Sequence, residues 1–149
     1  MTVTQAIVKS NKAMRDSFLA AGWLNGDEVT SYSKSKPYFF HYIVIKDKLV
    51  TNQSPIRNLF AVWGVNSVDS VGMADDSYRL QSSTIYATFN IADPVTDDKL
   101  TSSVGNVESE MLRRGWKMSL MSASDYDDAN KLRNIQVSFT KSLSDEDEE

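Results

Sequence analysis

The amino-acid sequence predicts an α+β fold: a mixed, mostly antiparallel β-sheet with two main helices packed on one face. Two stretches with helical periodicity are separated by runs of aromatic and β-branched residues, which predict strands between and after the helices. The expected order is helix, three strands, helix and two strands. A single core is expected, because 41% of the 149 residues are hydrophobic and 24% are charged, as in ordinary globular domains.

The first helix is expected from Val3 to Ala21. Thr2 and Gln5 have the spacing of a capping box, in which each side chain accepts a hydrogen bond from the backbone of the other residue. Apolar residues then recur on one face with a period of 3.6 residues: Val3, Ile7, Met14 and Phe18. Gly22 can adopt the left-handed conformation after the last turn, and Trp23 can then fold back onto the helix.

Strands are expected in the middle of the chain. The runs from Tyr38 to Ile45 and from Leu59 to Val65 are apolar, aromatic and β-branched, with a turn at 46–48 after the first. The segment from Asn66 to Ser77 is polar, contains glycine and predicts a loop. From Ser83 to Ile91 the residues alternate between apolar and polar, which predicts a strand with one buried face.

The second helix is expected to begin at once after this strand, with Asp93 as its N-cap and Pro94 at its first position. Its apolar residues repeat at helical spacing: Leu100, Val104, Val107 and Met111. Gly115 and Trp116 then repeat the pair that ends the first helix. A closing hairpin follows, with a tight polar connection from Asp125 to Lys131 and a last strand whose inward residues are Ile135, Val137 and Phe139.

One domain is expected over residues 1–141, followed by a disordered acidic tail over residues 142–149. The formal net charge of −4 comes from this tail, because residues 145–149 are all acidic, and the preceding 144 residues carry 16 basic and 15 acidic side chains. Proteins that grip phosphates do so with a surplus of Lys and Arg. Tight binding of nucleic acid is therefore not expected.

The residue types that are missing restrict the possible chemistry. The chain has no cysteine, which excludes disulfides, thiolate zinc sites and cysteine nucleophiles. No run approaches about 18 apolar residues, and the N-terminus lacks the pattern of a signal peptide, so we expect no membrane partner and synthesis in the cytoplasm. Phosphate-binding loops of the Gly-rich types are absent from the sequence.

Two features suggest chemistry but are better explained structurally. The single histidine, His41, lies within an apolar strand, so a packed or interface histidine is favoured. Asp125, Asp127 and Asp128 suggest a calcium loop, yet counting from Asp125 puts Asn130 where an EF-hand has glycine and Gln136 where it has glutamate. We therefore expect no catalytic residue, no metal and no cofactor, and hence no enzyme.

A different class of function is kept as an alternative. Trp63, with Phe60 and Val62 nearby, could belong to a base-stacking platform, and some proteins that bind single-stranded nucleic acid carry an acidic tail. Those tails usually end in an apolar residue, whereas this one ends in Glu149, and the expected helices are too prominent for a minimal oligonucleotide-binding barrel.

The C-terminal part of the sequence, residues 83–143, resembles the tail terminator and tail completion proteins of long-tailed bacteriophages. The features that carry the resemblance are an alternating strand, an acidic start to a helix, a helix that ends before Gly-Trp, and a closing hairpin. The turn of this hairpin is rich in Asp and Tyr: Asp125, Tyr126, Asp127 and Asp128. The first helix also matches the opening element of the family.

This resemblance implies a structural virion protein that forms a homo-oligomeric ring of six copies. Such a ring caps the tail tube protein, joins the tail to the head completion or connector protein, and lets DNA pass through its lumen without tight binding. Exposed loops usually carry recognition, so we expect contacts in the 66–77 loop, with Val71 and Met73, and in the 125–131 turn. Another tube or secretion-system component and a cytoplasmic binding module remain as alternatives.

Overall fold

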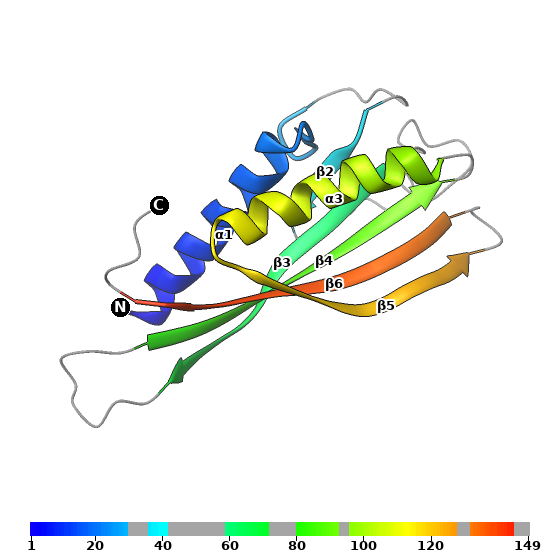
Figure 1. Cartoon of the computed structure of the whole chain (residues 1–149). Helices are drawn as coiled ribbons and strands as arrows, with labels where there is room; N and C mark the ends of the chain where they lie inside the picture. The colour runs from blue at the N-terminus through cyan, green and yellow to red at the C-terminus, as the bar shows by residue number, and fades with distance from the viewer. Residues whose placement is uncertain (30–35, 42–58, 72–79, 93–95, 128–131, 145–149) are drawn as a thin grey trace.

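Residues 1–29, 36–41, 59–71, 80–92, 96–127 and 132–144 are described in the computed structural model (Figure 1). In chain order they form the elements α1 (Val3–Ala20), β1 (Leu24–Asn25), β2 (Tyr38–His41), β3 (Leu59–Val71), β4 (Leu80–Ala92), α3 (Asp97–Arg113), β5 (Lys117–Asp127) and β6 (Leu132–Leu143). These residues confirm the α+β class, with two helices and a six-stranded sheet.

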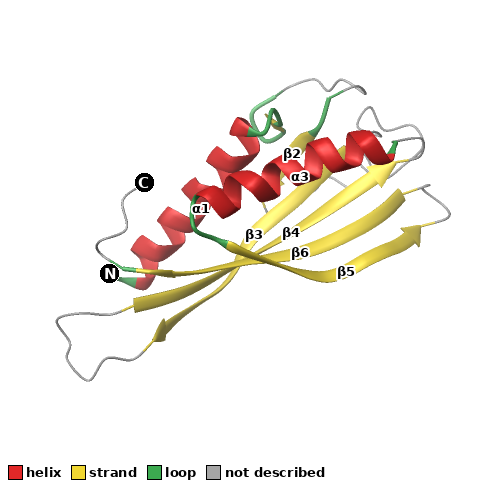
Figure 2. Cartoon of the chain, viewed as in Figure 1, coloured by secondary structure: helices red, strands yellow, loops and turns green. Residues whose placement is uncertain are grey.

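The strands lie in the order β1-β2-β3-β4-β6-β5. The short strands β1 and β2 run parallel to β3, while β3, β4, β6 and β5 are joined by antiparallel pairing. Both helices lie on the same face of this sheet, as the sequence predicted (Figure 2). The opposite face, which we call the open face, carries no helix in the described part of the chain.

The ends of the helices confirm the local predictions. Thr2 and Gln5 form the capping box, with hydrogen bonds of 2.8 and 3.1 Å. Gly22 and Gly115 have φ angles of 89° and 91°, and each is followed by a tryptophan whose backbone N–H donates a hydrogen bond back to the last turn. Trp23 and Trp116 are both buried in the core.

The second helix begins later than predicted. Its N-cap is Thr96, whose hydroxyl accepts a hydrogen bond from the backbone N–H of Lys99 at 3.2 Å, so Asp93 is not the cap and Pro94 is not the first helical residue. Asp93 and Pro94 both lie outside the described residues.

At the C-terminal end of α3, hydrogen bonds from Arg113 and Arg114 lower the pKa of the Glu110 carboxyl.

Three predicted boundaries are wrong, because pairing between strands extends polar segments that look like loops or tail. Asn66–Val71 continues β3, after a register shift between Val65 and Ser67, instead of forming a loop. Asp125–Asp127 belongs to β5 instead of a turn. Ser142 and Leu143 belong to β6, and Leu143 is 3% exposed, so the domain extends past residue 141. Met73, Asp128 and the acidic residues 145–149 lie outside the described residues.

Small residues bring α1 close to the rest of the core. The buried stripe of this helix contains Ala6, Ser10, Ala13, Met14, Ser17 and Phe18. The hydroxyl of Ser10 lies 2.6 Å from that of Ser83 on β4, and the hydroxyl of Ser17 donates to Met111 Sδ on α3. Val3, the first residue of α1, was expected on this stripe but is 43% exposed.

The glycine that ends α1 provides a test of this packing. Replacing Gly22 with alanine is expected to lower the free energy of unfolding by about 1–2 kcal/mol, because a side chain is strained in the left-handed conformation. No atom lies within 4 Å of the added Cβ, so the cost comes from the backbone alone.

Gly105, inside α3, is the matched control, because its added Cβ also meets no atom within 4 Å. Gly105→Ala is expected to raise the free energy of unfolding by about 0.5–1 kcal/mol. Urea denaturation of both variants measures the difference, and effects of the same sign would contradict the assigned backbone conformations.

Candidate protein-interaction surface

The open face is built from side chains that alternate with those of the core. On β4 and β6 its members are uncharged and mostly carry hydroxyl or amide groups: Ser82, Thr84, Tyr86, Thr88, Asn90, Asn134, Gln136, Ser138, Thr140 and Ser142. The register pairs them directly across the two strands, Thr84 with Thr140 and Tyr86 with Ser138, for example. Ten neighbouring positions without a charge form a neutral polar surface.

The margins of the open face differ from its centre. Tyr38, Phe40 and Phe60 also point to this side, but they are 3%, 5% and 1% exposed, so the β2 margin is buried. Among the residues whose side chains the structure describes, the exposed charges of this face lie near one end, where Asp69 pairs with Ser82 and Lys117 pairs with Thr140. The accessible and neutral part of the face therefore lies over β4 and β6.

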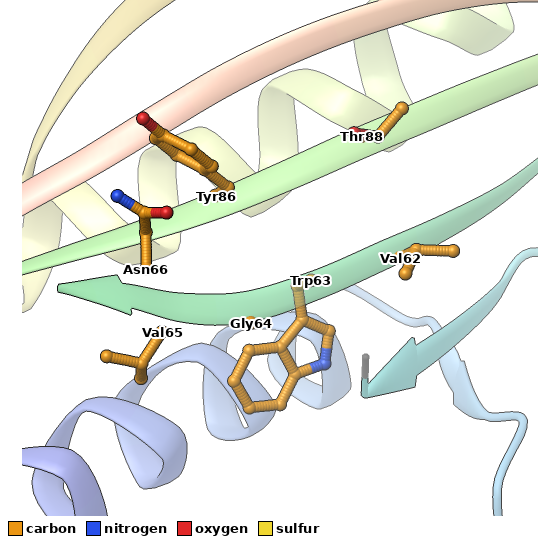
Figure 3. A pocket seen from close by; sticks show the side chains of 7 residues that line it. All are labelled: Val62, Trp63, Gly64, Val65, Asn66, Tyr86 and Thr88. Atoms are coloured by element: carbon orange, nitrogen blue, oxygen red, sulfur yellow. The ribbon is translucent and has the colours of Figure 1, made fainter. Parts of the chain in front are cut away.

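A shallow hollow interrupts the open face between β3 and β4. Gly64, which has no side chain, is paired with Tyr86, and the hollow beside them has a volume of about 250 Å³ (Figure 3). Tyr86 and Asn66 point to the same side from neighbouring strands, whereas Trp63 points to the other side. Tyr86 is 39% exposed, which makes the hollow a recess with an aromatic wall and polar neighbours.

A second hollow, of about 420 Å³, lies at the end of the sheet near the start of β5. Its lining combines hydroxyl groups with two lysines and a glycine: Ser82, Gly115, Lys117, Thr140, Lys141 and Ser142. The ammonium group of Lys141 donates a hydrogen bond to the backbone oxygen of Arg114 at 2.8 Å, so this lysine helps to hold the end of α3 on the sheet.

The predicted contact residues lie at opposite ends of the sheet. Val71 is the last residue of β3 and pairs with Leu80, at the start of β4. Asp125, Tyr126 and Asp127 pair with the first residues of β6, which lie beside the end of β4. At about 3.3 Å per residue, the length of β4 separates the two groups by about 40 Å. The structure therefore does not join them in one site.

His41 is a packed histidine, as the sequence favoured. Its ring is stacked on Trp63, with 4.1 Å between the ring centroids and 16° between the planes. Its backbone N–H donates a hydrogen bond to the Asp27 carboxylate at 3.0 Å. Burial lowers the pKa of His41 below its ordinary value of 6.5; the carboxylate of Asp27 raises it and the charge of Arg15 lowers it further.

The base-stacking interpretation is wrong for the residues that suggested it. Trp63 is 2% exposed and belongs to the core beneath the helices, and Phe60 is 1% exposed. Neither ring can stack on a nucleotide base without opening the fold. The calcium-loop interpretation also lacks its loop, because Asp125 and Asp127 lie in β5 and Gln136 lies in β6.

Sequence reasoning missed the pairing of Gly64 with Tyr86. The alternation places Tyr86 on the polar side of its strand, but the sequence gives no sign of which residue lies opposite.

Within the described ranges, no three His, Asp or Glu side chains gather as metal ligands do, and neither helix is long and apolar enough to cross a membrane.

No protein-family model matches this chain, and no curated protein matches it. Function is therefore inferred from the geometry of the surface and from the resemblance of residues 83–143.

The pH dependence of stability tests the environment of His41. The unfolded chain takes up a proton near pH 6.5, whereas the folded chain resists protonation until a lower pH. The free energy of unfolding is therefore expected to fall as the pH drops through 6.5, and to level off below the folded pKa.

His41→Phe keeps an aromatic ring on Trp63 but cannot titrate. Urea unfolding between about pH 5 and 7.5 should show a weaker pH dependence for this variant than for the wild-type protein. Identical slopes would show that His41 is not shielded as described.

Proposed function

We propose that this chain is a structural virion-assembly protein, a tail terminator that caps the tube of a phage tail as a ring and joins the tail to the head connector. The observation that carries the proposal is the position of the two predicted contact segments, at opposite ends of one sheet. A cap has to bind the tube on one side and another partner on the other. Two segments about 40 Å apart meet this requirement.

The sheet makes the separation rigid. β3 and β4 are each 13 residues long and are paired along nearly their whole length, and β4 is paired with β6 in the same way. Recognition segments at the ends of such a scaffold keep a fixed distance and orientation. A ring of these subunits would therefore have two distinct sides, one for the tube and one for the connector.

The neutral open face is compatible with the passage of DNA. A surface that grips phosphates does so with lysine and arginine, whose binding releases counterions. The open-face positions of β4 and β6 contain neither residue. DNA in contact with such a surface would not be held tightly, in agreement with the nearly neutral charge of residues 1–144.

The edge of the sheet offers only a short route to assembly. β5 has no neighbour on its outer side among the described residues, so its backbone could pair with another chain. Register shifts between Leu120 and Ser122 and between Ala123 and Asp125 bend the strand. Continuous pairing with another chain is therefore restricted to Lys117–Leu120, and a ring needs further contacts.

The length of the tube tests the proposed function. The protein is mixed with the tube subunits of the same phage, and the tubes are measured by electron microscopy with and without it. The proposed function predicts that the protein stops growth and gives shorter, uniform tubes.

Replacing Asp125 and Asp127 with alanine should weaken capping, and a circular dichroism spectrum like that of the wild-type protein checks that the fold is kept. Glu108→Ala, on α3, is the control, because it removes an acidic side chain remote in sequence from both contact segments. Tubes that grow to the same length with and without the wild-type protein would contradict the assignment.

A further inference from the structure

The hollow near the start of β5 differs in charge from the neutral centre of the open face. Two lysines, Lys117 and Lys141, line it together with the hydroxyl groups of Ser82, Thr140 and Ser142, and none of the described residues in its lining is acidic. Ammonium and hydroxyl groups both donate hydrogen bonds to the oxygens of anions. We call this hollow the lysine hollow, and its chemistry favours a carboxylate or a phosphate.

The fold holds both lysines at the lysine hollow. Lys117 is the first residue of β5 and is paired with Thr140. The stem of Lys141 lies over Gly115, where an added Cβ would lie 3.2 Å from its Cε atom, and its ammonium group donates a hydrogen bond to the backbone oxygen of Arg114. An ammonium group has three N–H donors, so one such bond does not exhaust its capacity.

The acidic end of the sequence leaves the fold beside the lysine hollow. Ser142 lines the hollow, and the next two residues, Leu143 and Ser144, are 3% and 8% exposed, so burial fixes the chain up to this point. The five acidic residues 145–149 follow directly in the sequence. Their point of attachment is three residues from Lys141, which is at most about 10 Å of extended chain. The longest acidic run of the sequence therefore starts within reach of the lysines.

We propose that the acidic segment 145–149 binds the lysine hollow of its own chain, with its carboxylates on the ammonium groups of Lys117 and Lys141. Charge complementarity selects this occupant, because the segment has five carboxylates and the hollow has two cations. The tether favours it over a free anion, because an attached segment has an effective concentration on the order of millimolar. Each exposed ion pair is weak alone, so the contact depends on this tether.

This inference deepens the proposed function, and the role of the contact rests on that function. In a ring that lets DNA pass, lysines beside the neutral open face are a point where phosphates would be held. Carboxylates that already occupy these lysines compete with the phosphates of DNA. The acidic segment therefore shields the cationic end of the open face.

Zero-length cross-linking tests the contact in the full chain. A carbodiimide joins a carboxylate and a lysine amine as an amide, with loss of water, when the two groups touch. Lys36 is the internal control, because it is exposed and precedes β2 at the other end of the sheet. There Tyr38 pairs with Phe60, and Phe60 pairs with Asn90. Asn90 lies about 25 Å along β4 from Ser82, beyond the reach of five residues.

The proposal predicts amide links from the segment 145–149 to Lys117 or Lys141 at low salt, at least about tenfold more abundant than links to Lys36. These links should decrease strongly in about 0.5 M sodium chloride, which screens exposed charges. A mixture of isotope-labelled and unlabelled protein identifies links between copies. The absence of links to the two lysines, equal labelling of Lys36, or links that join labelled to unlabelled chains would overturn the proposal.

Binding of short duplex DNA tests the shielding role. A chain that ends at Ser144 keeps the buried end of β6 and should bind DNA at least about tenfold more tightly than the full chain at low salt. In the shortened chain, Lys117→Gln should reverse most of this gain and reduce the salt dependence by about one ion, whereas Lys36→Gln should have little effect. No gain on shortening, or equal effects of the two substitutions, would refute the shielding.

The tube-length experiment separates this inference from the proposed function. A protein that stops tube growth but gives no link between its acidic segment and the lysine hollow would refute the contact and leave the cap intact. Links to the lysine hollow in a protein that does not change tube length would establish the contact and refute the cap.

Discussion

Two buried tryptophans, each placed by a glycine that ends a helix, fix both helices to the same face of the sheet. The ring of Trp23 packs against Phe18 of its own helix and Phe89 of β4, and its Nε1–H donates a hydrogen bond to the backbone oxygen of Ser103 on α3. Trp116 joins the same core at the end of α3. Because both helices are held on one face, the other face is left to the solvent or to a partner.

The composition of that second face follows from this constraint and determines what it can bind. Alternation along β4 and β6 directs apolar residues under the helices and hydroxyl and amide groups outwards. The resulting surface is neutral at its centre, with a recess where Gly64 lies beside Tyr86. A neutral surface with one exposed aromatic residue suits a protein partner better than a phosphate backbone.

Local interactions made part of this structure predictable from the sequence. The Thr2 capping box and the left-handed conformation of Gly22 depend on residues a few positions apart, so their sequence patterns were sufficient. The strand Asn66–Val71 and the residues Asp125–Asp127 were misjudged because partner strands, and not local composition, decide whether a polar segment is extended. The recess could not be predicted, since Gly64 and Tyr86 become neighbours only through the register of β3 and β4.

The mass of the assembled protein in solution tests the central claim, which is that this chain works by self-assembly into a closed ring. Native mass spectrometry of the full chain, with negative-stain images of the same sample, measures the number of copies and the shape of the particle. The proposed ring predicts one discrete multiple of the 16.7 kDa subunit, six copies by the family resemblance, with a central opening. A monomer at the concentrations used for assembly would contradict it.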